Sequence, residues 1–184
     1  MEKNLEKFIN MCYHLFGQKK NKMEKREKNS MKREDDIMND AITLSNYIIR
    51  RFNQNKVSIT NLKLQKILYY VQGYSLKMFG VPAFDDEIYA WHYGPVVPMA
   101  YYEFNIYGAY PLTWDVNDEL PVFKARYVNM VDAVIDKCMP YFSSALVEKT
   151  HREAPWKNAY EGSVITKRAM KFYFDNNDPL GVIE

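Results

Sequence analysis

Thr60-Asn61-Leu62-Lys63-Leu64-Gln65-Lys66-Ile67-Leu68-Tyr69-Tyr70-Val71-Gln72-Gly73 is the stretch of this sequence that decides its fold. Apolar residues continue at helical spacing as far as Phe79. Thr60 is a residue type that begins helices, and Gly80 is a type that ends them. We therefore predict a long central helix over residues 61–79.

Polar side chains interrupt this apolar helix, and buried polar groups need hydrogen-bonding partners. Gln65, Tyr69 and Gln72 are three or four residues apart, so they share one face of the helix. That face can bind a neighbouring strand of the same chain or an outside protein. We favour the internal partner, because buried polar groups are usually satisfied within their own domain. The candidate partner-binding or motif residues here are Lys63, Gln65, Lys66, Tyr69 and Gln72.

Further helices are predicted on both sides of the central helix. Amphipathic spacing and end signals place them over residues 40–53, 98–107, 128–138 and 143–147, around Trp156 and Ala159, and after Thr166 through Tyr173. Alternating residues from Ile88 to Tyr93 predict a short strand, and Leu120 to Phe123 a second. The expected fold is mainly α (α+β), a compact multi-helix domain with a small two- or three-stranded antiparallel sheet.

The composition fits one globular domain with an appendage. The chain has 184 residues, of which 47% are hydrophobic and 26% charged. Its net charge of +2 argues against electrostatic binding to nucleic acid. Cys12 and Cys138 lack zinc-ligand spacing, so we expect reduced thiols and no metal or other cofactor. No apolar run is long enough to span a bilayer, which predicts a cytoplasmic protein without a membrane partner.

Residues 1–37 differ in composition from the rest of the chain. Apolar residues at helical spacing predict an amphipathic helix over Met1 to Phe16. From Gly17 to Asp36 acidic and basic residues are interleaved, which indicates a solvated linker rather than a nucleic-acid-binding tail. Because Met38 opens a new pattern, residues 1–37 have an alternative interpretation as an upstream extension. Residues 38–184 form the predicted helical domain.

The second unusual segment is Trp91-His92-Tyr93-Gly94-Pro95-Val96-Val97-Pro98. Its two prolines and one glycine predict a stiff turn that holds aromatic rings in place. Aromatic residues are enriched where proteins bind tightly. The alternative is an aromatic core beneath a turn, which we favour for Trp91 because of its size. The candidate binding residues from this region are Trp91, Tyr93, Gly94, Pro95, Tyr101 and Tyr102.

The third segment, Thr150-His151-Arg152-Glu153-Ala154-Pro155-Trp156, has a histidine and a carboxylate close in sequence. A hydrolase that uses His151 and Glu153 is one hypothesis. Two residues apart on a helix, however, their side chains point away from each other, and no metal motif such as H-E-x-x-H is present. We therefore predict no catalytic residues and treat His151, Glu153 and Trp156 as candidate binding or motif positions, with His151 capping a helix or hydrogen-bonded in the core.

These three segments together resemble the Panacea domain, also called the SocA-like or phage-associated antitoxin domain. The resemblance covers about Met38 to Asp175 and agrees in both order and spacing. It rests on Leu62 to Tyr70 with Gln72-Gly73, on Trp91 to Pro98 with Tyr101, Phe104, Tyr107 and Gly108, and on Thr150-His151 with Glu153, Pro155, Trp156 and Ala159. Departures are Ile67, where leucine is usual, and Met99-Ala100, where an acidic and a branched residue are common.

The resemblance implies an antitoxin of a toxin-antitoxin pair that neutralises a cognate protein toxin by direct binding, without enzymatic activity. Two alternatives remain open at this point. One is an adaptor that delivers a toxin to a cytoplasmic protease, and the other is a phage-associated regulatory binding protein. The sequence names neither the toxin nor the oligomeric state.

Overall fold

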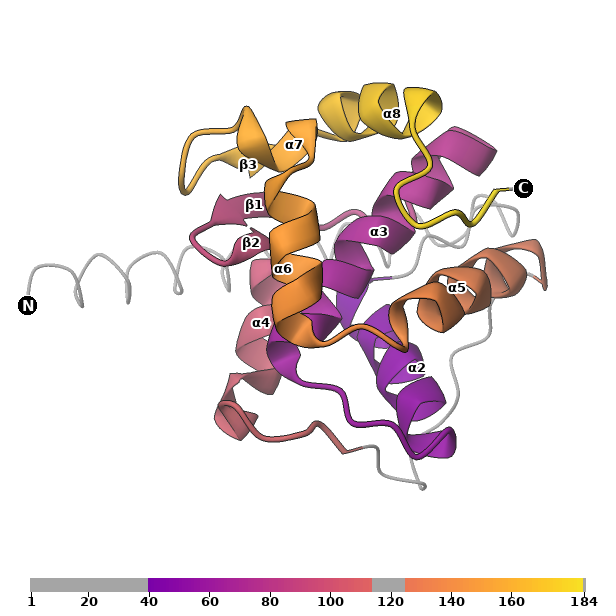
Figure 1. The fold of residues 1–184 in the computed structure, drawn as a ribbon, viewed down its shortest axis with the longest axis vertical. Coiled ribbons are helices and arrows are strands. Elements are labelled where there is room, and N and C mark those ends of the chain that lie inside the picture. The colour runs from indigo at the N-terminus through magenta and orange to yellow at the C-terminus, as the bar shows by residue number, and fades with distance from the viewer. Residues whose placement is uncertain (1–39, 114–124, 184) are drawn as a thin grey trace, which may run out of the picture. The chain divides into compact units, whose positions relative to one another are not determined.

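The computed structural model of this chain describes residues 40–113 and 125–183, shown in colour in Figure 1. The predicted leader helix, the charged linker and the predicted strand over Leu120 to Phe123 lie outside the described residues. Within the described part, no helix is long and apolar enough to cross a membrane.

The described residues form a mainly helical domain with one small sheet, as predicted. The helices are α2 (Ala41–Gln54), α3 (Asn61–Phe79), α4 (Pro98–Phe104), α5 (Ala125–Cys138), α6 (Ser143–His151), α7 (Ala154–Lys157) and α8 (Lys167–Asn176), and α4 continues into the 3₁₀ turn η1 (Asn105–Tyr107). The strands are β1 (Ile88–Trp91), β2 (Gly94–Val96) and β3 (Val164–Ile165).

Helix α3 is the centre of the domain. The Thr60 side chain accepts a hydrogen bond from the Lys63 backbone N–H, and Gly80 ends the helix in the left-handed conformation with φ 70°. Helices α2, α4, α5, α6 and α8 and strand β2 all contact α3 (Figure 1). As a result α3 is buried on all sides from Lys63 to Leu76, which explains how polar side chains on this helix come to lie in the interior.

Helix α8 packs closely against α3 at Gly73. A Cβ atom added to Gly73 would lie 2.3 Å from the ring of Phe174, so only glycine fits at this position. The Phe174 ring also makes edge-to-face contacts with Tyr69, Tyr70 and Tyr74. The final helix is therefore held against the central helix by aromatic packing over a glycine.

The sheet has the order β2-β1-β3, and both pairings are antiparallel. Our predicted strand from Ile88 to Tyr93 is wrong at its end, because β1 stops at Trp91 and His92-Tyr93 form a two-residue turn. Gly94, with φ 100°, lets the chain reverse into β2, where we expected only a rigid break. Pro95 is tolerated in β2 because this is an edge strand.

Two helix boundaries also differ from the prediction. The helix expected over residues 98–107 is α-helical only to Phe104 and finishes as the 3₁₀ turn η1. Helix α7 ends at Lys157, so Ala159 lies beyond it, and Pro155 occupies its first turn, a position that proline tolerates. The helix that begins at Ser143 and the helix capped by Thr166 are confirmed.

Candidate functional site

The β1–β2 hairpin is fastened to helix α3 by two polar side chains. Lys66 Nζ donates a 2.9 Å hydrogen bond to the carbonyl oxygen of Pro95, and the Val97 N–H donates to Gln65 Oε1 at 2.9 Å. Gln65 Nε2 in turn donates to Asn61 Oδ1. A Cβ on Gly94 would lie 2.7 Å from Lys66 Cε and 3.0 Å from Thr150 Oγ1, so helices α3 and α6 both press against the hairpin.

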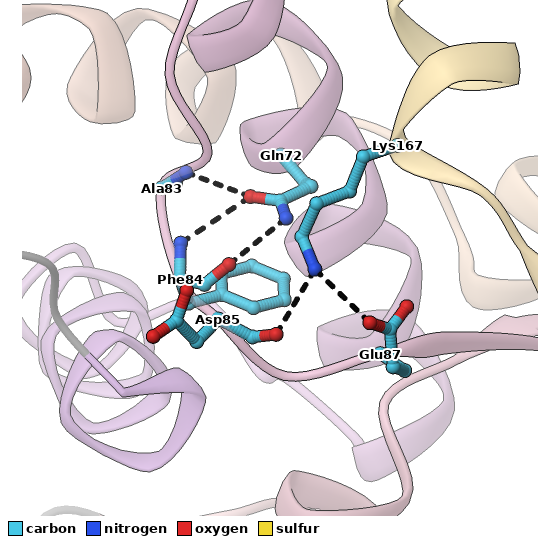
Figure 2. A network of polar contacts seen from close by, with 6 residues as sticks. All are labelled: Gln72, Ala83, Phe84, Asp85, Glu87 and Lys167. Carbon is cyan, nitrogen blue, oxygen red and sulfur yellow. Dashed lines mark hydrogen bonds and ion pairs between the residues drawn. The ribbon is translucent and has the colours of Figure 1, made fainter.

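Gln72 holds the segment that leads from α3 into β1. Its Oε1 accepts from the N–H groups of Ala83 and Phe84, and its Nε2 donates to the carbonyl oxygen of Phe84 (Figure 2). Lys167 of α8 approaches the same segment and contacts the Asp85 carbonyl and the Glu87 carboxylate (Figure 2). Both polar atoms of the Gln72 side chain, which we considered as a contact for an outside protein, are therefore hydrogen-bonded within the chain.

Glu153 joins α3 to the segment between α6 and α7. The Tyr69 hydroxyl donates to Glu153 Oε2 at 2.9 Å, and the Tyr70 hydroxyl donates to Oε1 at 2.7 Å. Burial raises the pKa of Glu153 to about 7, although both hydrogen bonds act in the opposite direction. Burial and the neighbouring carboxylate raise the pKa of both tyrosines. The cluster is thus a buried carboxyl group held by two neutral donors.

Lys66 is the second buried ionisable group. Burial alone lowers the pKa of its ammonium to about 7. Lys63 Nζ is also buried and donates to the carbonyl oxygen of Met139, and burial lowers its pKa as well. Both lysines donate to backbone carbonyl groups within the chain, so these contacts stabilise the fold.

His151 and Trp156 pack under the hairpin. The two rings stack with centroids 3.8 Å apart and 9° between their planes, and Trp156 Nε1 donates to the carbonyl oxygen of Trp91. Burial, and then the charge of Lys66, lower the pKa of His151. Glu153 meanwhile contacts Tyr69 and Tyr70, so this carboxylate does not orient the imidazole as a hydrolytic pair would require.

Part of the predicted aromatic set reaches the surface. Trp91, Tyr101 and Tyr102 are half-buried and meet edge to face, with centroids 5.0 Å apart for Trp91–Tyr101 and 5.4 Å apart for Tyr101–Tyr102. Tyr93, in the hairpin turn, is 63% exposed and packs against His92. We call the packed rings of Trp91, Tyr101 and Tyr102, together with Tyr93 in the adjoining hairpin turn, the hairpin aromatic patch.

The predicted residues outside the hairpin aromatic patch differ in burial. The buried group supports the hairpin and the core, and it consists of Lys63, Gln65, Lys66, Tyr69, Gln72, Gly94, Pro95 and Glu153. The internal-partner interpretation is confirmed for Gln65, Tyr69 and Gln72. His151 and Trp156 are half-buried beside the hairpin aromatic patch. Contact of any of these residues with a partner stays a prediction.

Sequence reasoning missed several residues that complete these networks. Asn61 orients Gln65, Thr150 lies against Gly94, and Lys167 reaches back to residues 85 and 87. The Tyr74 hydroxyl donates to Asp178, which also caps the N–H groups of Val182 and Ile183. Asn61 and Gln65 are four residues apart on α3, so helical spacing indicates this pair. No sequence pattern indicates the other pairings, because those partners are brought together only by packing. Among the described residues, no group of three or more histidine, cysteine or carboxylate side chains could hold a metal ion.

The fold and the three motif segments define a helical domain in which polar side chains of the central helix α3 support a β-hairpin. Comparison with known families identifies the class of this domain. The model of the family "Antitoxin SocA-like, Panacea domain" matches residues 64–157, and the chain belongs to this family. It is also 35% identical over 69 residues to Antitoxin SocA of Caulobacter vibrioides. That match covers 38% of this chain and 37% of the relative. No solved structure matches the chain.

Proposed function

We propose that this protein is an antitoxin that neutralises a cognate protein toxin by direct, non-catalytic binding. The observation that carries the proposal is the family match, which spans α3 from Leu64, the whole hairpin, α4, α6 and α7. These elements contain the polar network and the aromatic face described above. The similar curated protein is named as an antitoxin, and an antitoxin role implies a toxin as partner.

The hairpin aromatic patch is the proposed contact surface. It carries the exposed ring of Tyr93 on a hairpin whose backbone is held by Lys66 and Gln65. A rigid scaffold lowers the entropy that aromatic side chains lose on binding, and tyrosine and tryptophan are common binding hot spots. The neutralising mechanism that fits such a surface is occlusion of the toxin.

We further propose that the protein acts in the cytoplasm. We also propose that residues 1–37 contribute to binding of the toxin. The location rests on the sequence, which has no paired cysteine motif; Cys138 is a buried thiol whose pKa is raised to about 12 by burial, so it is unreactive. The predicted amphipathic helix over Met1 to Phe16 is too short to be stable alone in water, so it would gain order on binding.

The test is co-expression with the product of the neighbouring gene. Growth arrest by the neighbour alone, relief by this chain and a stable co-purifying pair are the expected results. Tyr93→Ala should weaken rescue, whereas Tyr110→Ala, which also removes a well-exposed ring, should not. Deletion of residues 1–37 should reduce rescue if this segment contacts the toxin. Absence of a complex in cells where the neighbour is toxic would contradict the proposal.

The same experiment separates occlusion from delivery to a protease. Rescue in cells that lack the cytoplasmic proteases is expected for an antitoxin that acts by occlusion. Rescue that disappears in those cells, with the toxin level unchanged after induction of this chain, would instead establish the adaptor alternative. A regulatory DNA-binding protein would show binding that weakens steeply with salt.

A further inference from the structure

An open groove lies between α7, β3 and α8, on a part of the domain that the proposed function does not use. Its volume is about 590 Å³, and its lining includes Asn158, Val164, Ala169 and Tyr173. Tyr160 and Phe172 also line it and are 87% and 74% exposed, so two aromatic rings stand at the border of the groove. Exposed aromatic rings around a cavity of this size are typical of binding sites.

The lining of the groove is uncharged. Charged residues make up 26% of the chain, yet all of the groove residues are apolar, hydroxyl, amide or aromatic. A charged occupant would lose hydration on entering such a groove without gaining an opposite charge. The groove therefore matches an uncharged segment with apolar side chains.

The β3 side of the groove presents free backbone groups, and the bulge before β3 fixes their direction. The Gly162 N–H donates to the Ala90 carbonyl at 2.7 Å, and the Ala90 N–H donates to the Ser163 carbonyl at 2.9 Å. Gly162 has φ 78°, the left-handed conformation that glycine adopts at the first position of a G1 β-bulge. Ala90 and Ser163 thus form a hydrogen-bonded position of the ladder.

In an antiparallel ladder, hydrogen-bonded positions alternate along the strand. Ile165, paired with Ile88, therefore bonds to β1, and Val164, paired with Tyr89, directs its N–H and C=O away from β1. Neither group of Val164 has a hydrogen bond within residues 40–113 and 125–183. Because β3 is an edge strand that also lines the groove, this donor and acceptor are available to another strand.

We propose that the groove between α7, β3 and α8 binds an uncharged, extended peptide segment, which adds to the edge of β3 and places an apolar side chain in the cavity. Paired backbone hydrogen bonds to Val164 supply the alignment, and burial of the apolar side chain beside Phe172 and Tyr173 supplies affinity. An amphipathic helix cannot replace this ligand, because its backbone groups are already bonded internally. The inference goes beyond toxin neutralisation and does not depend on it.

The probe for this test is a synthetic octapeptide, acetylated and amidated, that alternates threonine with valine and phenylalanine. Titration into the full-length protein should slow hydrogen exchange at the Val164 amide and leave the Ile165 amide, already bonded to β1, unchanged. Val164→Pro removes the outward N–H at an edge position that tolerates proline. This variant should weaken binding about fivefold to tenfold, the effect of one lost hydrogen bond, whereas Val164→Thr should bind as the parent does.

A second variant keeps the test decisive if Val164→Pro fails to fold. Ala169→Arg places a charge in the groove from an exposed position on α8 and should abolish binding, whereas Ser144→Arg on α6, outside the groove, should not. The proposal is overturned if no binding is measured at millimolar peptide. Equal binding to Ala169→Arg and the parent also overturns it, as does self-association of the parent that Ala169→Arg removes. Rescue from the toxin is measured separately, so the peptide-binding proposal and the antitoxin proposal can each fail without the other.

Discussion

Replacement of Lys66 by methionine tests the central structural claim, that a lysine is buried under the hairpin with only one neutral hydrogen-bond acceptor. Lys66 is fully buried, and its Nζ donates to the Pro95 carbonyl. Thr150 Oγ1 and the ring of His151 also lie in this region, and no carboxylate among the described residues compensates the charge of Lys66. Methionine keeps most of the volume and removes the ionisable group.

The magnitude follows from proton linkage. The pKa of Lys66 is lowered to about 7 in the folded chain from 10.5 in the unfolded chain. The unfolded chain therefore binds more protons between these values, so this lysine destabilises the fold progressively as the pH falls from 10.5 towards 7. Relative to Lys66→Met, the wild type should gain about 3 kcal/mol of unfolding free energy between about pH 7 and about pH 9.5.

The assay is urea unfolding of both proteins at several pH values, with the free energy of unfolding extrapolated to water. The quantity to plot is the difference between wild type and variant, which removes the titration of all other groups. Lys157→Met is the matched control, since this lysine of α7 is solvent-exposed, and its difference should be flat. A flat difference for Lys66→Met as well would refute burial of an uncompensated ammonium at this position.

Three further predictions concern the same interior. For Glu153→Gln, the difference in unfolding free energy, wild type minus variant, should decrease by about 2 kcal/mol from about pH 5 to about pH 8, because the folded carboxyl keeps its proton up to about 7 while the unfolded one releases it near 4.5. A difference that rises over this range in urea unfolding would contradict a raised pKa. Gly73→Ala should cost about 2 to 3 kcal/mol, since its Cβ would lie 2.3 Å from the Phe174 ring. Thermal unfolding measures this loss, and an unchanged midpoint would show that α8 is not seated on α3. Trp156→Phe should cost about 1 kcal/mol by leaving the Trp91 carbonyl without its donor, as measured by urea unfolding, and no loss would argue against that hydrogen bond.

The sequence predicts the helices well because their signals are local. Thr60 and Gly80 mark the ends of α3, and Thr166 marks the start of α8, through backbone groups within a few residues. The hairpin was only half predicted, since the residues of β2, Gly94-Pro95-Val96, resemble a chain break more than a strand. Strand β3 has two residues, too few to show an alternating pattern.

The candidate site is less predictable than the fold for a physical reason. The pairing of Gln65, Tyr69 and Gln72 on one face could be derived from helical spacing, but their partners are up to 84 residues away in sequence. Whether these side chains bond within the chain or contact an outside protein depends on the packing around α3. The groove beside β3 is even harder to predict from sequence patterns, because it is formed by three elements, one of them an edge strand of only two residues.

Burial of the motif residues limits which side chains remain available to a partner. Lys66 and Gln65 bond to the hairpin segment, and Glu153 bonds to tyrosines of α3, so these polar side chains support the fold of this chain. Under the proposed function, contact with a partner falls to exposed side chains such as Tyr93, whose replacement changes contacts without exposing the core.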